Sequence, residues 1–242
     1  MRTNRCWIVL AAVTAIAFLA QTDAHATSLL LDDPNDGIPA LVINDGGLYD
    51  VNPAVGAVTF VGSVGHWSMN VTTGLSHPLQ GSPEIPYLDL SSVDSTTAGD
   101  STTAISGNYG GELYIALTQT DFRSPIPGAL TFEVGGTTQG QIGFGFAVSD
   151  SNKLFGYDSF QAYAPQNHST YFGPGAYSLS QAYAPPAVLD TYSMTIMAHI
   201  VHTGVQTTSF DAQVTTVPEP STLILFGFGL VGMALLRKKG RG

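Results

Sequence analysis

Three stretches of the chain alternate between large apolar residues and small or polar ones at every second position. In an extended strand successive side chains point to opposite faces, so this period of two predicts strands with one buried face. Such a face must pack against a second layer, which restricts the chain to a small set of folds. The apolar members of the runs are Leu130, Phe132 and Val134, then Ile142, Phe144, Phe146 and Val148, and then Tyr192, Met194, Ile196, Ala198 and Ile200.

Clusters of Gly, Pro, Asn and Asp separate the apolar runs, and helix signals are nearly absent between the two termini. Leu113–Leu117 is apolar on both faces, which is typical of a strand at the centre of a sheet. Ser91–Ser106 is poor in apolar residues and predicts a loop or a sheet edge. The pattern predicts an all-β fold, an antiparallel β-sandwich or jelly roll. The expected turns are Asp32–Gly37, Asn44–Gly47, Ser124–Gly128, Gly135–Gly136 and Gly173–Gly175.

The N-terminal residues 1–26 are typical of a secretory signal peptide, which we predict as a signal helix. They have a positive start, an apolar stretch and a cleavage site made of small residues. These features are, in order, Arg2 and Arg5, Trp7–Ala20, and Ala24 with Ala26. An uncleaved N-terminal anchor is the alternative. Either way, the region that follows is predicted to lie outside the cytoplasm.

The C-terminal residues 217–242 combine a Pro-Glu-Pro tripeptide, an apolar span and a basic end. The span 222–236 covers about 22 Å as a helix, which suits a bilayer core of about 30 Å if the flanking cations snorkel. We predict a single transmembrane helix there, with a buried helix as the alternative, and a basic end on the cytoplasmic side. The tripeptide is Pro218, Glu219 and Pro220, and the cations are Arg237, Lys238, Lys239 and Arg241.

This C-terminus resembles the PEP-CTERM sorting signal of Gram-negative bacteria. The resemblance covers about the last 25 residues and implies nothing about the fold of the rest. It implies an exosortase, a membrane-embedded enzyme that cuts near Pro-Glu-Pro, as a partner. It further implies a protein held transiently in the inner membrane with its domain in the periplasm, and then delivered to the cell surface or beyond. The expected domains are a signal peptide (1–26), a β-sandwich (27–216) and a sorting signal (217–242).

The charge of the central region restricts its partners. Residues 27–216 contain two cations, Arg123 and Lys153, and sixteen carboxylates, which gives a formal charge of −14. Nucleic acid and anionic lipid repel such a domain, so we predict no nucleic-acid partner. The same residues contain no cysteine. Stability must therefore come from burial rather than from disulfides.

No catalytic motif stands out, and we predict that the protein is not an enzyme. His199 and His202 are three residues apart, which on a strand places them on opposite faces, so they cannot chelate one metal ion together. Glu84, Glu112 and Glu133 are available for glycoside hydrolysis, but the sequence places no two of them across a cleft. A secreted hydrolase stays an alternative.

Asp32–Gly37 is the only stretch that suggests a metal. It packs several oxygen ligands into a short loop, as calcium loops do, but Pro34 interrupts the usual spacing. An Asx or Gly turn between two strands explains the same residues. We predict no cofactor, with weak calcium binding as the alternative.

Aromatic residues cluster between positions 157 and 183, together with a short repeat. Gln161–Pro165 recurs as Gln181–Pro185, which predicts two tyrosine-bearing strands or loops lying side by side. Tyrosine surfaces stack on sugar rings, but they also pack sheet edges. We expect a structural or interaction role at the surface or in the extracellular matrix, with a carbohydrate-binding module as the alternative. The resemblance to PEP-CTERM proteins implies the link to exopolysaccharide or biofilm. The aromatic residues are Tyr157, Tyr163, Tyr171, Phe172, Tyr177 and Tyr183.

Overall fold

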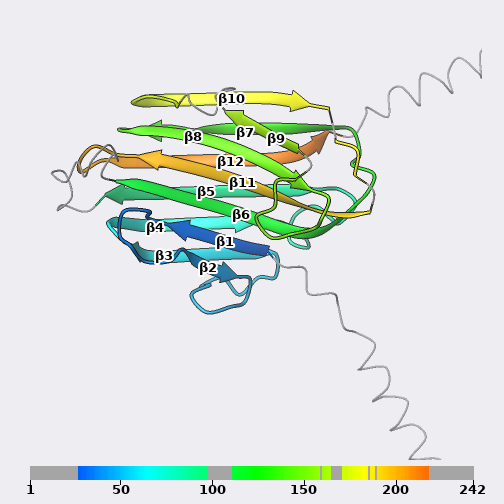
Figure 1. Ribbon diagram of the computed structural model, residues 1–242, viewed down its shortest axis with the longest axis horizontal. Coiled ribbons are helices and arrows are strands. Elements are labelled where there is room, and N and C mark those ends of the chain that lie inside the picture. Colours follow the sequence, from blue (N-terminus) through cyan, green and yellow to red (C-terminus); the bar gives the residue numbers. More distant parts are fainter. Residues whose placement is uncertain are drawn as a thin grey trace, which may run out of the picture.

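The computed structural model of the protein describes residues 27–96, 111–158, 160–164, 171–184, 186–188 and 190–217. These residues form two six-stranded antiparallel sheets packed face to face, which is a β-sandwich (Figure 1). The predicted all-β class is therefore confirmed. The strands are β1 (Thr27–Asp32), β2 (Leu41–Asn44), β3 (Ala57–Val64), β4 (Trp67–Leu75), β5 (Tyr87–Thr96), β6 (Glu112–Arg123), β7 (Ala129–Thr138), β8 (Gln141–Ser149), β9 (Phe160–Ala164), β10 (Gly175–Tyr183), β11 (Thr191–Val201) and β12 (Thr207–Val217).

The strand order explains how the layers are joined. Sheet A has the order β2-β1-β6-β11-β8-β9, and sheet B has the order β10-β7-β12-β5-β4-β3. The chain crosses between the sheets several times, so six of the ten neighbouring strand pairs are not consecutive in sequence. β9 and β10 end the two sheets at the same edge of the sandwich, where the rings of Phe160 and Tyr183 lie 5.9 Å apart.

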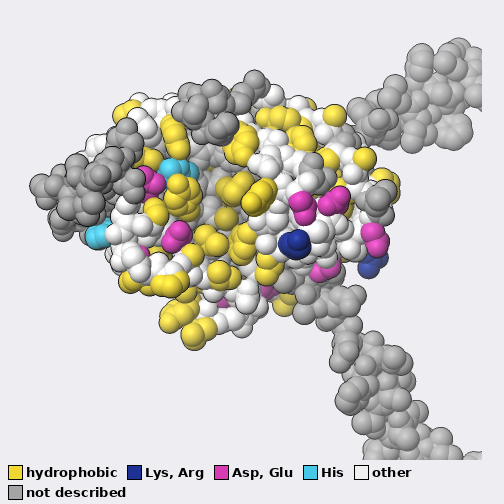
Figure 2. Space-filling view, in the orientation of Figure 1, with side chains coloured by type: hydrophobic (Ala, Val, Ile, Leu, Met, Phe, Trp, Pro, Cys, Tyr) yellow, Lys and Arg dark blue, Asp and Glu magenta, His cyan; other side chains and the backbone are white. Residues whose placement is uncertain are grey.

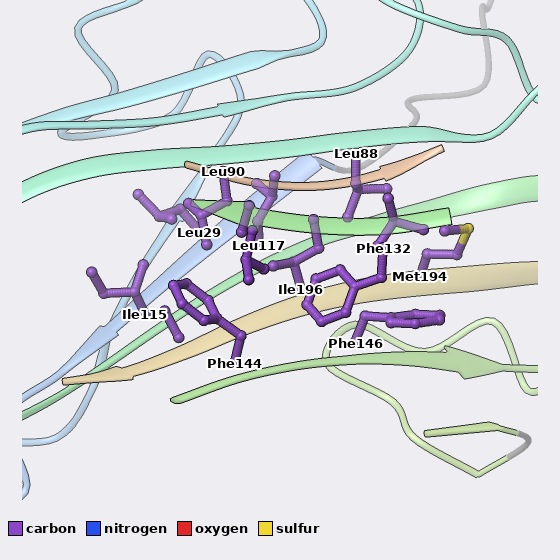
Figure 3. Close-up of a cluster of buried hydrophobic side chains, with 14 of the residues drawn as sticks. Leu29, Leu88, Leu90, Ile115, Leu117, Phe132, Phe144, Phe146, Met194 and Ile196 are labelled. Carbon is purple, nitrogen blue, oxygen red and sulfur yellow. The ribbon is translucent and has the colours of Figure 1, made fainter. Parts of the chain in front are cut away.

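The core lies between the sheets and is built from the apolar residues at alternating strand positions. Leu88 and Phe132 of sheet B face Phe146, Met194 and Ile196 of sheet A (Figure 3). All five side chains are buried. Full burial of one such side chain contributes about 1.5–3 kcal/mol, so this layer stabilises a domain that has no disulfide among its described residues.

The alternating runs lie where the period of two places them. They form the inward faces of β7, β8 and β11, whose apolar residues are buried. Leu113–Leu117 belongs to β6, which lies between β1 and β11 in the middle of sheet A. The predicted central strand is thus confirmed.

The prediction for Ser91–Ser106 is wrong over its first six residues. These residues form the second half of β5, which pairs with β12 on one side and β4 on the other. Ser92, Asp94 and Thr96 occupy the inward positions of that strand and are buried. Because polar residues fill the buried face, the alternation in hydrophobicity that marks other strands is absent here.

Gly135–Gly136 is not a turn, because both residues lie within β7. A Cβ on Gly136 would lie 2.1 Å from the carbonyl oxygen of Ser209 in β12. Its φ of 157° is also one that side chains disfavour. This pair of glycines therefore serves a close approach of two backbones and not a chain reversal.

Both predicted targeting segments lie outside the described residues. They include the signal peptide 1–26 with Ala24 and Ala26, and the span 222–236. They also include Pro218, Glu219 and Pro220, and the basic residues Arg237, Lys238 and Lys239. In the part of the chain that the structure describes, no helix is long and apolar enough to cross a membrane. The domain boundaries stay predictions.

Candidate functional site

The outer face of sheet A is hollowed by two adjoining cavities. The first has a volume of about 520 Å³ and the second about 460 Å³, and Tyr171 and His199 line both. We call the two together the outer groove. Figure 2 views this face and shows the hollow, with hydrophobic side chains inside it, histidine side chains to its left and acidic side chains on both sides.

Strand register places the residues of the groove floor next to one another. Leu30 of β1 pairs with Ala116 of β6, which pairs with Met197 of β11. Met197 pairs with Gly145 of β8, which pairs with Tyr163 of β9. All five belong to the first cavity. One row of outward positions across five strands therefore forms the floor.

The groove is hollow because its central positions carry small side chains. Gly143, Gly145 and Ala116 occupy outward positions on β8 and β6. A Cβ on Gly145 would meet the ring of Tyr163, with Cδ1 only 3.2 Å away. Such a contact is tighter than most real Cβ contacts, so glycine at this position lets the tyrosine ring lie over the sheet.

Tyr171 reaches the groove from the segment between β9 and β10. The next residue, Phe172, bridges to Ile142 by two backbone hydrogen bonds of 2.9 and 3.1 Å. The Phe172 ring also stacks on Tyr177, with centroids 4.8 Å apart. Phe172 thus fixes the chain, and Tyr171 next to it lies where the two cavities meet.

A hydrogen-bonded cluster lies where the two cavities of the groove meet. The hydroxyl of Tyr171 lies 2.8 Å from Nδ1 of His199, and the Tyr114 ring stacks on the His199 ring with centroids 4.0 Å apart. Nε2 of His199 lies 3.3 Å from Oε2 of Glu112, at an angle outside hydrogen-bond geometry. The Tyr114 hydroxyl lies 3.5 Å from the same carboxylate oxygen.

The groove carries negative charge. Asp32 lines the first cavity and Glu112 the second, and no described Lys or Arg lines either one. Burial lowers the pKa of His199, although Glu112 opposes the shift, so the imidazole is neutral at neutral pH. Burial, and after it the charges of Glu112, Tyr171 and Asp32, raise the pKa of Tyr114 to about 12. Both carboxylates therefore act on the Tyr114 phenol.

The aromatic cluster predicted from the sequence divides into two groups. Tyr163 and Tyr171 line the outer groove, whereas Tyr177 and Tyr183 pack on Phe144 and Phe146 inside the sandwich edge. Tyr157 is exposed and lines neither cavity. Both predicted uses of tyrosine, stacking surface and edge packing, thus have a structural counterpart.

The two copies of the repeat do not lie side by side in one sheet. Tyr163 is on β9 of sheet A and points outward, while Tyr183 is on β10 of sheet B and points inward. The two copies thus end different sheets at the same edge of the sandwich, and their tyrosines face opposite ways, because sequence similarity fixes neither the sheet that a strand joins nor its face.

The Asp32–Gly37 loop uses its carboxylates internally. One carboxylate oxygen of Asp33 accepts a hydrogen bond of 3.0 Å from the backbone N–H of Asn35. The other oxygen accepts a hydrogen bond from the backbone N–H of His66 and lies close to Nδ1 of the His66 ring, both at 2.9 Å. Asp36 accepts the Ile38 amide at 2.6 Å. The bonds from Asn35 and Ile38 form Asx turns. Among the described residues no group of three or more His, Cys, Asp or Glu side chains is placed to hold a metal ion.

Neither the two histidines considered for zinc nor the three glutamates considered for hydrolysis come together. His199 faces the groove, whereas His202 is fully buried and packs on Trp67, so the two histidines lie on opposite faces as predicted. Of the glutamates only Glu112 lines the groove. Glu84 pairs with Arg123 at 3.3 Å, and Glu133 accepts a hydrogen bond from Ser180 on sheet B.

Sequence reasoning missed Tyr114, His199 and Asp32 as site residues. Tyr114 carried a usable signal, because it is a large aromatic residue at the outward position of a strand that is otherwise apolar on both faces. The other two become visible only when the register of β1, β6 and β11 is known.

Fold and site together define a β-sandwich with an aromatic, acidic groove on one face. The family model described as the PEP-CTERM protein-sorting motif matches residues 216–239. The chain thus carries that sorting motif, and the resemblance of its C-terminus to PEP-CTERM proteins is confirmed. The motif implies export and a membrane-anchored sorting signal.

The chain is also weakly similar to a solved structure. The solved structure of TmCBM61 in complex with beta-1,4-galactotriose matches with a TM-score of 0.31 and 8% identity, over 65% of this chain and 92% of that chain. At this level the likeness carries no argument about a ligand. No curated protein matches the sequence.

Proposed function

We propose that the protein is an exported, non-enzymatic glycan-binding protein whose outer groove holds a short stretch of a polysaccharide chain. This role is the alternative that the sequence left open, a carbohydrate-binding module, and it places the protein at the cell surface or in the extracellular matrix with exopolysaccharide as the partner. The binding surface consists of Tyr163, Tyr171 and Tyr114, and the polar groups around them orient the sugar hydroxyls.

The observation that carries the proposal is the pairing of aromatic rings with a long, shallow hollow. Sugar rings present apolar C–H faces that pack on aromatic side chains, and hydroxyls that bond to carboxylate, amide and imidazole groups. Tyr163 and Tyr171 supply the first kind of contact. Glu112, Gln141 and Gln206 in the second cavity supply the second. The combined hollow is of a size that holds a few sugar units.

The test compares groove tyrosines with a tyrosine outside the groove. The full chain is purified in a detergent without a sugar headgroup and screened on a glycan array, and hits are measured by calorimetry. Tyr163→Ala and Tyr171→Ala should each weaken binding about tenfold. Tyr157→Ala is the matched control, because Tyr157 is exposed and outside both cavities. An array without hits, or equal losses in all three variants, contradicts the proposal.

We further propose that an exosortase-type enzyme processes the chain near Pro218-Glu219-Pro220 after transient anchoring in the inner membrane. The support is the sorting motif at residues 216–239. Mass spectrometry of the mature termini should find the new C-terminus near Pro218–Pro220 in wild-type cells and the intact tail in exosortase-deficient cells. It should also find an N-terminus at Thr27. An intact tail in both strains contradicts this part of the proposal.

A further inference from the structure

The residues around Tyr114, where the two cavities of the outer groove meet, have a geometry that the proposed glycan binding alone does not explain. Tyr114 lies between two carboxylates on the outer face of sheet A. Asp32 is its register partner on β1, and Glu112 is two positions away on the same face of β6. A general sugar platform needs hydroxyl-bonding groups there, but it does not need two acids around one ring.

The cluster around Tyr114 contains no cation that compensates the two carboxylates. His199 stacks on Tyr114. Among the described residues that line the groove, it carries the only titratable nitrogen. It is neutral at neutral pH for the reasons given above. Of the two described cations, Arg123 is paired with Glu84, and neither Arg123 nor Lys153 lines the groove. The local charge is therefore negative, in a domain that is itself strongly acidic.

We infer that the groove selects a polysaccharide of amino sugars with free ammonium groups, such as a glucosamine chain, over neutral and acidic chains. The inference rests on the proposed function and specifies its ligand. An ammonium group between Asp32 and Glu112 gains two charge-assisted hydrogen bonds, and the face of the Tyr114 ring adds a cation–π contact. A uronic acid in the same place meets two like charges, which costs affinity.

The experiment uses calorimetry on the full chain in a detergent without a sugar headgroup, at low salt and about pH 6. The probes are tetramers of β-1,4-linked glucosamine, of N-acetylglucosamine and of galacturonate. We expect the glucosamine tetramer to bind about fivefold to tenfold more tightly than its N-acetylated form. The galacturonate tetramer should bind least, and added salt should reduce the preference.

Two variants connect the preference to the two acids. Asp32→Asn and Glu112→Gln keep the side-chain size and should each remove most of the preference for the free amine, while binding of the N-acetylated tetramer changes little. Glu133→Gln is the matched control, since it makes the same charge change on the outer face of sheet B. Circular dichroism verifies folding, and the ligand ranking and salt dependence of the unaltered protein test the inference even if a variant fails to fold.

The outcomes distinguish the preference for free amines from glycan binding itself. If the N-acetylated tetramer binds as tightly as the glucosamine tetramer, or if galacturonate binds best, the inference is overturned and glycan binding stands. If no glycan binds at all, both fail. If either glucosamine-based tetramer is cleaved during incubation, the two carboxylates are catalytic groups and the inference is overturned in favour of a hydrolase.

Discussion

At the scale of single residues, Gly145 has the most direct influence on the groove. The Tyr163 ring lies over it, with Cδ1 at 3.2 Å and Cε1 at 3.3 Å from the position that a Cβ would take. Gly145→Ala should therefore push the ring off the sheet by a few tenths of an ångström and weaken glycan binding about threefold to tenfold. Calorimetry gives the affinity, and thermal unfolding should show little change.

Gly173→Ala provides the comparison for that variant. A Cβ on Gly173 would meet nothing within 4 Å, and Gly173 lines neither cavity. The same substitution there should leave both affinity and stability unchanged. If both variants bind glycan like the unaltered protein, the position of the Tyr163 ring is not important for binding.

Asp94 makes stability depend on pH in a direction opposite to that of most carboxylates. Burial between the sheets raises its pKa to about 7 from the usual 3.8, and only Ser92 opposes the shift, by donating a hydrogen bond of 2.6 Å. Below about pH 4 the carboxyl is protonated in both folded and unfolded chains. As pH rises through about 4 to 7, the unfolded chain releases the proton first, so stability falls. The full cost is on the order of 4 kcal/mol at most.

Asp94→Asn should remove this loss. We expect the variant and the unaltered protein to melt at similar temperatures near pH 4, and the variant to melt roughly 5–15 °C higher near pH 8. The readout is the difference in melting temperature between the two proteins across that range. His202, whose pKa burial lowers to about 4, titrates in both proteins and cancels in the difference. A difference that does not change with pH contradicts the prediction.

At the scale of elements, the sequence predicted the strands that became β6, β7, β8 and β11 from their apolar residues, and it assigned the end of β5 to a loop or a sheet edge. β7, β8 and β11 were found because hydrophobicity alternates along them. The end of β5 was missed because Ser92 and Asp94 occupy its buried face. The local sequence shows the alternation of hydrophobic residues along a strand. Burial of hydroxyl and carboxyl groups depends instead on hydrogen-bond partners far along the chain, such as Thr72, which bonds to Ser92 at 2.7 Å.

The groove was less predictable than the strands that form it. Its floor is a row across five strands in the order β1-β6-β11-β8-β9, which chain order does not contain. A shift of one residue in any pairing would turn that strand's outward side chains to the core. Tyr163 and Tyr171 could be proposed from the aromatic cluster alone. Tyr114, Asp32 and His199 required the register, because they come from three separate parts of the chain.

Phe172 fixes the described residues just before β10 in place. Phe172 pairs with Ile142 through its backbone and packs its ring on Tyr177 and Phe144. Phe172→Ala should cost about 2–4 kcal/mol of unfolding free energy through the lost packing. It should also weaken glycan binding as much as Tyr171→Ala does, because Tyr171 loses its fixed place. Denaturant unfolding and calorimetry measure the two effects.

Tyr183→Ala distinguishes anchoring from general destabilisation. Its ring packs on Phe146 and Phe160 at the same edge but does not line the groove. This variant should lose stability while binding glycan nearly as well as the unaltered protein. If it loses affinity as Phe172→Ala does, the groove depends on the whole edge and not on one anchor.

At the scale of the whole molecule, the folded domain runs directly into the sorting motif. The motif begins at residue 216, yet β12 continues to Val217, which pairs with Ala129 of β7. β12 lies between β7 and β5, so most of this strand is hydrogen-bonded on both sides. The residues just before Pro218 are therefore held in a sheet, where a processing enzyme that binds an extended chain has little access.

A spacer of ten Gly and Ser residues between Val217 and Pro218 should consequently speed processing. Such a flexible chain adds roughly 17 Å of mean reach, enough to separate the tripeptide from the edge of the sandwich. Pulse–chase labelling in cells with exosortase should show faster conversion to the mature form. The same spacer inserted after Gly37, in the open turn between β1 and β2 where a Cβ would meet nothing within 4 Å, should leave the rate unchanged. An equal or slower rate for the first insertion would mean that the enzyme reaches Pro-Glu-Pro without any release from β12.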